Sequence, residues 1–172
     1  MKKIFALLTA LCCLFSFAAM AEEINWADIE PTIAASGVEG NFVTFDEISV
    51  KIWLPSDLKP VELSDDDKAQ GYIGYFQDDN QEATVAVSYV DMNGMSLEDF
   101  AAKLGEDSEC TEIEMATINS LPALTYRIPS RDVACVDFAT EAGYILEIVM
   151  NPLSVEGGDV VWGIVAASIQ AA

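Results

Sequence analysis

The sequence predicts an α+β domain in which helices flank an antiparallel β-sheet of six or seven strands. The first observation is a series of short apolar segments in the second half of the chain, separated by segments long enough only for turns. Such separators join antiparallel neighbours, so these strands should form a meander. The other two observations are strand pairs in the first half and apolar residues at helical spacing near the start, the middle and the end.

The start of the chain has the pattern of a secretory signal peptide. Lys2 and Lys3 precede an uncharged apolar run over residues 4–20, and Ala19 and Ala21 form the small-x-small pattern that signal peptidase cleaves. A membrane anchor is the alternative, but this run of 17 residues is short for a membrane span and ends in a cleavage pattern. We therefore expect a signal peptide.

Cleavage would define two parts, a signal peptide at residues 1–21 and a single domain at residues 22–172. The domain would be exported to the periplasm, the cell surface or the medium, with no stable membrane insertion after cleavage.

Composition excludes several classes of function. The chain has 172 residues, with 8 Lys and Arg, 29 Asp and Glu and no His, which gives a formal charge of −21. Nucleic-acid binding needs a cationic surface, so a nucleic-acid partner is excluded. The absence of His removes the commonest general base and metal ligand. Repulsion between so many carboxylates favours a soluble monomer.

The first helix is predicted from Trp26, Ile29 and Ile33, which recur at helical spacing, and Gly37 fits the left-handed position after its end. Asn25 and Asp28 are both candidates for its N-cap. Pro31 is tolerated best in the first turn of a helix, which favours Asp28. Two strands are expected next, at residues 42–45 and 48–54. The second has a solvent-exposed face of Ser49, Lys51 and Trp53 and ends at Pro55.

The middle of the chain predicts a loop, a hairpin and a helix. Residues 55–70 contain prolines and no sustained period, so they indicate a loop with one helical turn. Residues 71–76 and 83–90 form a hairpin around an acidic turn. A helix follows, with Ser96 and Asp99 in the arrangement of a capping box. After this helix we expect strands at residues 111–119, 123–128, 133–139 and 144–150, and a C-terminal helix within residues 155–169.

This order of elements resembles the Mog1/PsbP-like fold over residues 42–169. The local resemblance lies in residues 48–55, which enter a proline after a strand, in the helix start at residues 95–100, and in the paired strands of residues 118–126. More narrowly, the chain is similar to small exported bacterial proteins of unassigned function. The resemblance implies a sheet sandwiched by helices.

Function does not follow from such a fold. Photosystem-associated members of this group use ions and dock to a membrane complex, and other members grip a small GTPase. Neither set of contact residues has counterparts that can be placed in this chain. The absence of His argues against a manganese role of the photosystem type.

Cys110 and Cys135 are the cysteines that remain after cleavage of the leader. Because export leads to an oxidising compartment, we expect a disulfide between them, with two buried free thiols as the alternative. Neither is expected to be a catalytic nucleophile, because the chain has no His to deprotonate a thiol.

The carboxylates suggest two lesser alternatives. Residues 65–67, 78–80 and 91–93 are acidic segments whose oxygens suit calcium, although none matches an EF-hand loop, so calcium-dependent surface binding is one alternative. A carboxylate-based hydrolase is the other, because it needs a facing pair of Asp or Glu in a cleft.

Trp53, Tyr72 and Tyr75 are the candidate ligand surface, because they lie on or near strands with an expected wet face. The alternative is that these rings cover the sheet beneath a helix or loop. The sequence thus predicts a non-catalytic binding or accessory domain, with no cofactor, for a protein or cell-envelope partner. Its contacts are expected in the loops at residues 55–70 and 77–82 or on the exposed sheet face.

Overall fold

The computed structural model describes residues 23–46, 48–140, 143–155 and 157–172, so the expected signal peptide lies outside the described residues. The helices are α2 (Trp26–Ser36), α3 (Asp65–Ala69), α4 (Leu97–Leu104) and α5 (Gly158–Ala167), with a short 3-10 helix at Pro129–Arg131. The strands are β1 (Glu23–Ile24), β2 (Gly40–Phe45), β3 (Val50–Pro55), β4 (Lys59–Pro60), β5 (Tyr72–Gln77), β6 (Thr84–Asp91), β7 (Thr111–Ile118), β8 (Leu121–Ile128), β9 (Val133–Ala139), β10 (Tyr144–Asn151) and β11 (Gln170–Ala171).

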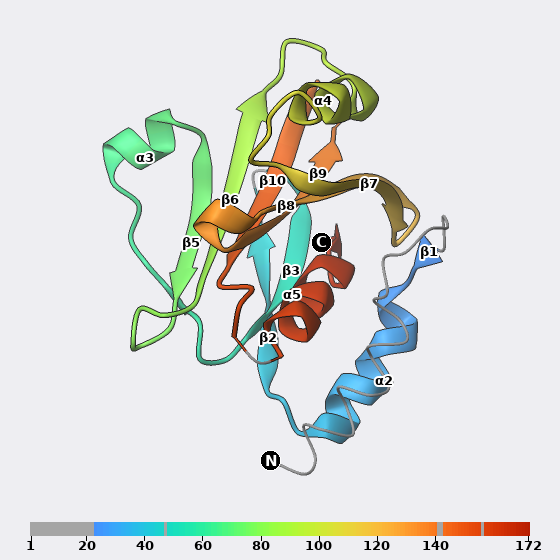
Figure 1. Ribbon diagram of the computed structural model, residues 1–172. Helices are drawn as coiled ribbons and strands as arrows, with labels where there is room; N and C mark the ends of the chain where they lie inside the picture. The colour runs from blue at the N-terminus through green and yellow to red at the C-terminus, as the bar shows by residue number, and fades with distance from the viewer. Residues whose placement is uncertain (1–22, 47, 141–142, 156) are drawn as a thin grey trace.

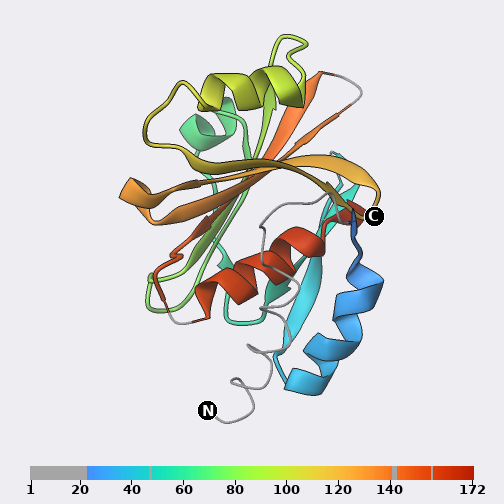
Figure 2. The same cartoon turned by 45° about the vertical axis from the view of Figure 1, so that its right-hand side comes forward.

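These strands form two sheets. The large sheet has eight strands in the order β1-β7-β8-β9-β10-β6-β5-β4, and all its pairs are antiparallel except β1 with β7. The small sheet has three strands in the order β11-β3-β2. Figures 1 and 2 show α4 on one side of the large sheet, and α5 with the small sheet on the other. The α+β class and the meander from β7 to β10 are therefore confirmed.

The single sheet of six or seven strands is corrected to two sheets of eight and three strands. The extra strands β1, β4 and β11 have two residues each, which is too short to produce an alternating pattern in the sequence. The separation of β2 and β3 into their own sheet depends on where distant segments pack, which local patterns do not encode.

The main core fills the space between the two sheets. Val85, Val136 and Ile148 on the large sheet have no exposed surface, and they share one apolar cluster with Ile52 of β3 and Val165 of α5. Burying side chains of this size contributes on the order of 1.5–3 kcal/mol each, so this layer is the main source of stability.

Helix α2 begins earlier than predicted. Its N-cap is Asn25, not Asp28, and Pro31 lies inside the helix. The proline removes one intrahelical hydrogen bond, but Trp26, Ile29 and Ile33 are buried against α5, and this packing keeps the helix intact. The predicted end is confirmed, because Gly37 is left-handed with φ 74°.

Asn119 joins the two ends of the described chain. Its backbone is left-handed, with φ 47°, in the turn between β7 and β8. Its side-chain oxygen accepts a hydrogen bond of 2.7 Å from the Trp26 N–H. Its amide nitrogen donates to the carbonyl oxygens of Ala167 and Ile169 at 2.8 and 2.6 Å. One side chain therefore ties the start of α2 to the end of α5 and the chain beyond it.

Candidate functional site

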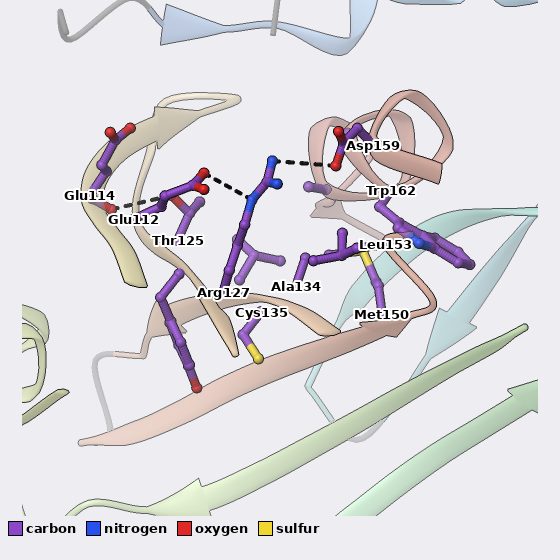
Figure 3. Close-up of a pocket in the computed structure, with 14 residues that line it drawn as sticks. Glu112, Glu114, Thr125, Arg127, Ala134, Cys135, Met150, Leu153, Asp159 and Trp162 are labelled. Carbon is purple, nitrogen blue, oxygen red and sulfur yellow. Dashed lines mark hydrogen bonds and ion pairs between the residues drawn. The ribbon is translucent and has the colours of Figure 1, made fainter. Parts of the chain in front are cut away.

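A small cavity lies where the meander meets α5, and Arg127 of β8 lies at its edge (Figure 3). The Arg127 Nε lies 3.0 Å from Glu112 Oε2, and its Nη2 lies 3.3 Å from Asp159 Oδ1. Arg127 therefore connects β7 with the first turn of α5.

Below this ion pair the cavity walls are largely apolar, with Ala134, Met150, Leu153 and Trp162 among them. The Trp162 Nε1–H donates a hydrogen bond of 2.6 Å to the Pro152 carbonyl oxygen, so it is not available to a ligand. The cavity holds about 60 Å³, far below the roughly 300–1,000 Å³ of small-molecule sites. It is a gap in the packing beneath an ion pair and does not have the size of a ligand site.

A buried polar cluster lies on the opposite face of the large sheet, the face that α4 covers in part. It consists of Ser88, Tyr126, Asp137 and Glu147, from four adjacent strands. Glu147 lies directly opposite both Ser88 and Asp137 in the strand register. The Tyr126 hydroxyl donates to Glu147 Oε1 at 2.7 Å, and the Ser88 hydroxyl donates to Oε2 at 3.2 Å.

Asp137 is the unusual member of this polar cluster. It has no exposed surface, and neither of its carboxylate oxygens has a hydrogen-bond partner. Burial, with a further effect of the Glu147 charge, raises the pKa of Asp137 to about 9. Its carboxyl group is therefore neutral at pH 7. Burial and the same two carboxylates also raise the pKa of Tyr126.

The polar cluster is unsuited to the hydrolase alternative. Asp137 and Glu147 face each other, but substrate would have to reach a carboxyl group that has no exposed surface. Helix α4 packs on β7, β8 and β9, and its one buried residue, Leu97, shares an apolar cluster with Tyr126. The arrangement is closed and has no cleft for a sugar chain.

A groove that we call the tyrosine groove lies at the other end of this sheet face. Strand β5 has an irregular register between Tyr72 and Gly74, so that Tyr72 lies opposite Ser88 and Tyr75 lies opposite Ala86. A regular strand would place residues three apart on opposite faces, but the bulge places both tyrosines on one face. They line a groove of about 420 Å³ together with Glu62, Asp67 and Gln70 of the adjoining segment.

A second groove, which we call the inter-sheet groove, lies where the two sheets meet. It is lined by Val43 of β2, Pro60 of β4 and Ile73 of β5, among others, and holds about 560 Å³. Strands β2 and β4 are edge strands of their sheets, so the groove runs between two sheet edges. Val61, which is 42 % exposed, borders both this groove and the tyrosine groove.

The candidate ligand residues separate into two groups. Tyr72 and Tyr75 are half-buried and share the tyrosine groove, as the structure places them on one face. The prediction that Trp53 is exposed is wrong: it is 7 % exposed and packs with Trp26 and Ile164. Trp53 nevertheless lines a depression of about 590 Å³ with Trp26 of α2 and Phe42 of β2, so its place on a ligand surface stays a prediction.

The disulfide prediction is corrected. Cys110 and Cys135 are free thiols. Cys110 precedes β7 and Cys135 lies in β9, with β8 between those strands. Two strand spacings are roughly 9–10 Å, more than the roughly 7 Å between Cα atoms that a disulfide allows. Burial raises the pKa of Cys135 to about 12, and burial with the nearby Asp107 and Glu109 also raises that of Cys110, so neither is an activated thiol.

The acidic segments use their carboxylates in local structure. Asp67 completes a capping box with Ser64 at the start of α3. Asp78 accepts from the N–H groups of Glu82 and Ala83 at 2.7 and 2.8 Å, and the bond from Ala83 contributes most to lowering its pKa. Among the described residues no three Asp, Glu, Cys or His side chains are arranged to hold a metal ion. The calcium alternative thus has no supporting arrangement in the described part of the chain.

Asp137 and Glu147 were not among the residues predicted from the sequence. Their signal is an acidic residue at a strand position between large apolar neighbours, as Asp137 is between Val136 and Phe138. The same pattern also occurs where a strand residue faces solvent, so the burial of Asp137 could be recognised only from the structure.

The comparisons with known proteins identify the fold. No protein-family model matches the chain, and no curated protein matches its sequence. The structure is similar to the solution structure of cyanobacterial PsbP (CyanoP) from Synechocystis sp. PCC 6803, with a TM-score of 0.57 and 13 % sequence identity. The match covers 78 % of this chain and 94 % of that one.

The chain has a PsbP-like fold. The expectation drawn from the order of elements is therefore confirmed. At this identity the PsbP-like fold is what the two chains share, and the likeness carries no site residues with it. None of the helices in the described residues is long and apolar enough to cross a membrane.

Proposed function

We propose that this chain is an exported, acidic, non-catalytic binding or accessory domain that engages a protein or another cell-envelope component. The observation that carries the proposal is the pair of grooves on either side of Val61, in the segment where the sequence predicted contacts. Each groove is several times larger than the cavity beneath Arg127. Both are large enough to receive side chains of a partner.

The inter-sheet groove has the features of a peptide-binding surface. Strand β2 pairs with β3 alone, so its other edge has no strand partner in the described structure. Extended peptides commonly bind by adding a strand to such an edge, while apolar pockets receive alternate side chains. Val43 and Ile73 supply apolar surface beside that edge.

The chemistry of the described residues supports a non-catalytic role. The chain has no His, the two thiols have raised pKa values, and Asp137 is neutral and enclosed. The two thiols and Asp137 therefore supply neither an activated nucleophile nor an accessible general base, which supports a binding role. The high negative charge supports a monomer that selects partners of positive charge.

Site-specific photo-cross-linking tests the proposal. A photoreactive residue replaces Val61 beside the grooves or, as the control, Met115 on β7, since their exposed fractions are 42 % and 43 %. We expect an adduct with one defined envelope protein at Val61 and none at Met115, followed by binding of that purified protein to the unmodified chain. Equal labelling at both positions, or no adduct at Val61 in the native envelope, would contradict the proposal.

A further inference from the structure

The tyrosine groove combines aromatic rings with fixed negative charge. The bulge in β5 directs Tyr72 and Tyr75 to the same face, and the small side chain of Ala86 lies opposite Tyr75. Bulges are frequent next to functional sites because they re-aim side chains. The groove therefore has two half-buried rings that a flat ligand can contact.

The wall of the groove holds a preorganised carboxylate. The Ser64 N–H and hydroxyl donate to Asp67 Oδ2 at 3.0 and 2.6 Å, and these bonds lower the pKa of Asp67. In the described structure Asp67 Oδ1 accepts no hydrogen bond, and neither Asp67 nor the exposed Glu62 belongs to an ion pair. Asp67 is thus ionised and held in place with one oxygen available.

The negative charge of the groove determines which sign of charge its ligand can have. Glu62 and Asp67 are among the lining residues, and no Lys or Arg is among them. The chain as a whole has a formal charge of −21. An anion would be repelled, whereas a cation would gain from the carboxylates and from the ring faces together.

We propose that the tyrosine groove binds an arginine side chain of an extended basic segment in the partner protein. This proposal rests on the proposed function and adds the chemistry of the partner. A guanidinium group is planar, stacks on aromatic rings and can present two N–H groups to a carboxylate, whereas an ammonium group is a compact, strongly hydrated charge. Tyr72 and Tyr75 supply ring faces on which a guanidinium can stack, and the free Oδ1 of Asp67 can accept one of its N–H groups.

A peptide titration followed by NMR tests this inference on the purified chain in roughly 0.15 M salt, which screens long-range attraction. The probe is an acetylated, amidated five-residue peptide with two arginines, compared with peptides that have lysine or the neutral analogue citrulline at the same places. We expect saturable shifts of the Tyr72 and Tyr75 resonances with the arginine peptide. The lysine peptide should bind more weakly, and the citrulline peptide should not bind.

Variants make the test specific to the groove. Tyr72→Leu and Glu62→Gln should each weaken binding of the arginine peptide by about tenfold. Glu62 makes no hydrogen bond or ion pair in the described structure, so Glu62→Gln leaves the fold intact. The matched controls are Tyr144→Leu, which changes a half-buried tyrosine on β10, and Asp79→Gln in the exposed hairpin turn. Both should bind as the unmodified chain does.

Equal affinity for all variants, equal affinity for the lysine peptide, or no binding would overturn the inference. The cross-linking experiment separates this failure from failure of the proposed function. If Glu62→Gln leaves the partner adduct at Val61 unchanged, the binding role stands and the arginine site is wrong. If the adduct itself is absent, the proposed function has failed.

Discussion

The two faces of the large sheet differ in chemistry although the same strands form both. In β10, Ile148 and Met150 face the small sheet and α5, with 0 and 2 % exposure, and their neighbours there are apolar. Glu147 and Val149 of the same strand point to the other face, where Glu147 meets Ser88 and Asp137. One face is a continuous apolar layer, and the other combines a polar cluster, α4 and the tyrosine groove.

This difference shows that the two faces of the sheet contribute differently to stability. The apolar face joins the two sheets and so determines the fold. The other face holds a buried carboxyl group without a hydrogen-bond partner, which lowers stability.

The largest expected effect comes from Asp137→Asn on the polar face. The pKa of Asp137 is about 9 in the folded chain against an ordinary value of 3.8, so its contribution to stability is fully present below pH 3.8 and is lost as the pH rises toward 9. Asparagine has nearly the same shape and does not ionise. The variant should therefore gain on the order of 4 kcal/mol over the unmodified chain at pH 7.

The measurement is urea unfolding of both chains between pH 4 and pH 9. The difference in the free energy of unfolding should grow by up to about 1.4 kcal/mol per pH unit across this range. Subtracting the two curves removes the effect of the other carboxylates, and Asp79→Asn in the exposed turn is the control. A difference that is independent of pH would show that Asp137 is ionised in the folded chain.

A matched pair of valines compares the two faces directly. Val136→Ala in the apolar layer, where Val136 has no exposed surface, should lower the free energy of unfolding by about 2–3 kcal/mol. Val149→Ala on the polar face, where Val149 is half-buried, should lower it by about 1 kcal/mol. Chemical denaturation measures both, and equal losses would mean that the faces are packed alike.

Tyr126→Phe tests the hydrogen bonds within the polar cluster. Glu147 would lose the 2.7 Å bond to its Oε1 and keep the one from Ser88. A lost bond to a charged group should lower the free energy of unfolding by about 1.5–3 kcal/mol, with the lower end expected because Glu147 is half-buried. Tyr144→Phe is the control, since its ring stacks on Tyr89 at 4.8 Å and the described structure gives its hydroxyl no hydrogen bond. If thermal and urea unfolding show no difference between the two variants, Tyr126 does not stabilise Glu147.

The smallest effect is expected for Arg127→Gln at the edge of the apolar layer. Its partners Glu112 and Asp159 are 58 and 60 % exposed, and pairs of this kind contribute under about 1 kcal/mol. The loss should shrink further in high salt. Arg131→Gln, an exposed arginine outside the described ion pairs, is the comparison for unfolding measured at low and high salt. A loss that salt does not change would indicate packing by the Arg127 stem.

The sequence predicted the elements whose signals are local. The meander from β7 to β10 followed from alternation and short turns, and α4 followed from Ser96 and the apolar spacing after it. In α4, Ser96 accepts from the Asp99 N–H as predicted, while the complete capping box is at Ser64 and Asp67. These features depend on residues a few positions apart, so sequence spacing encodes them.

The features that the sequence did not predict depend on distant segments. Trp53 is covered by Trp26 and Ile164, whose approach is not encoded near Trp53 itself. Asp137 has no exposed surface, and α4, which packs on its strand β9, lies more than thirty residues earlier in the sequence. The tyrosine groove needed a one-residue bulge in β5, and a change of one residue reverses which face a side chain takes. The sequence pointed to Tyr72 and Tyr75 separately, but their place in one groove required the structure.

The bonds of Asn119 also limit when the chain can fold. Its partners lie 93, 48 and 50 positions away. During synthesis Trp26 is made before Asn119, and Asn119 is made before Ala167 and Ile169. Native docking of α2 on α5 must therefore wait until residue 169 has been made, which keeps a nascent chain of this topology open for longer than one built from local contacts.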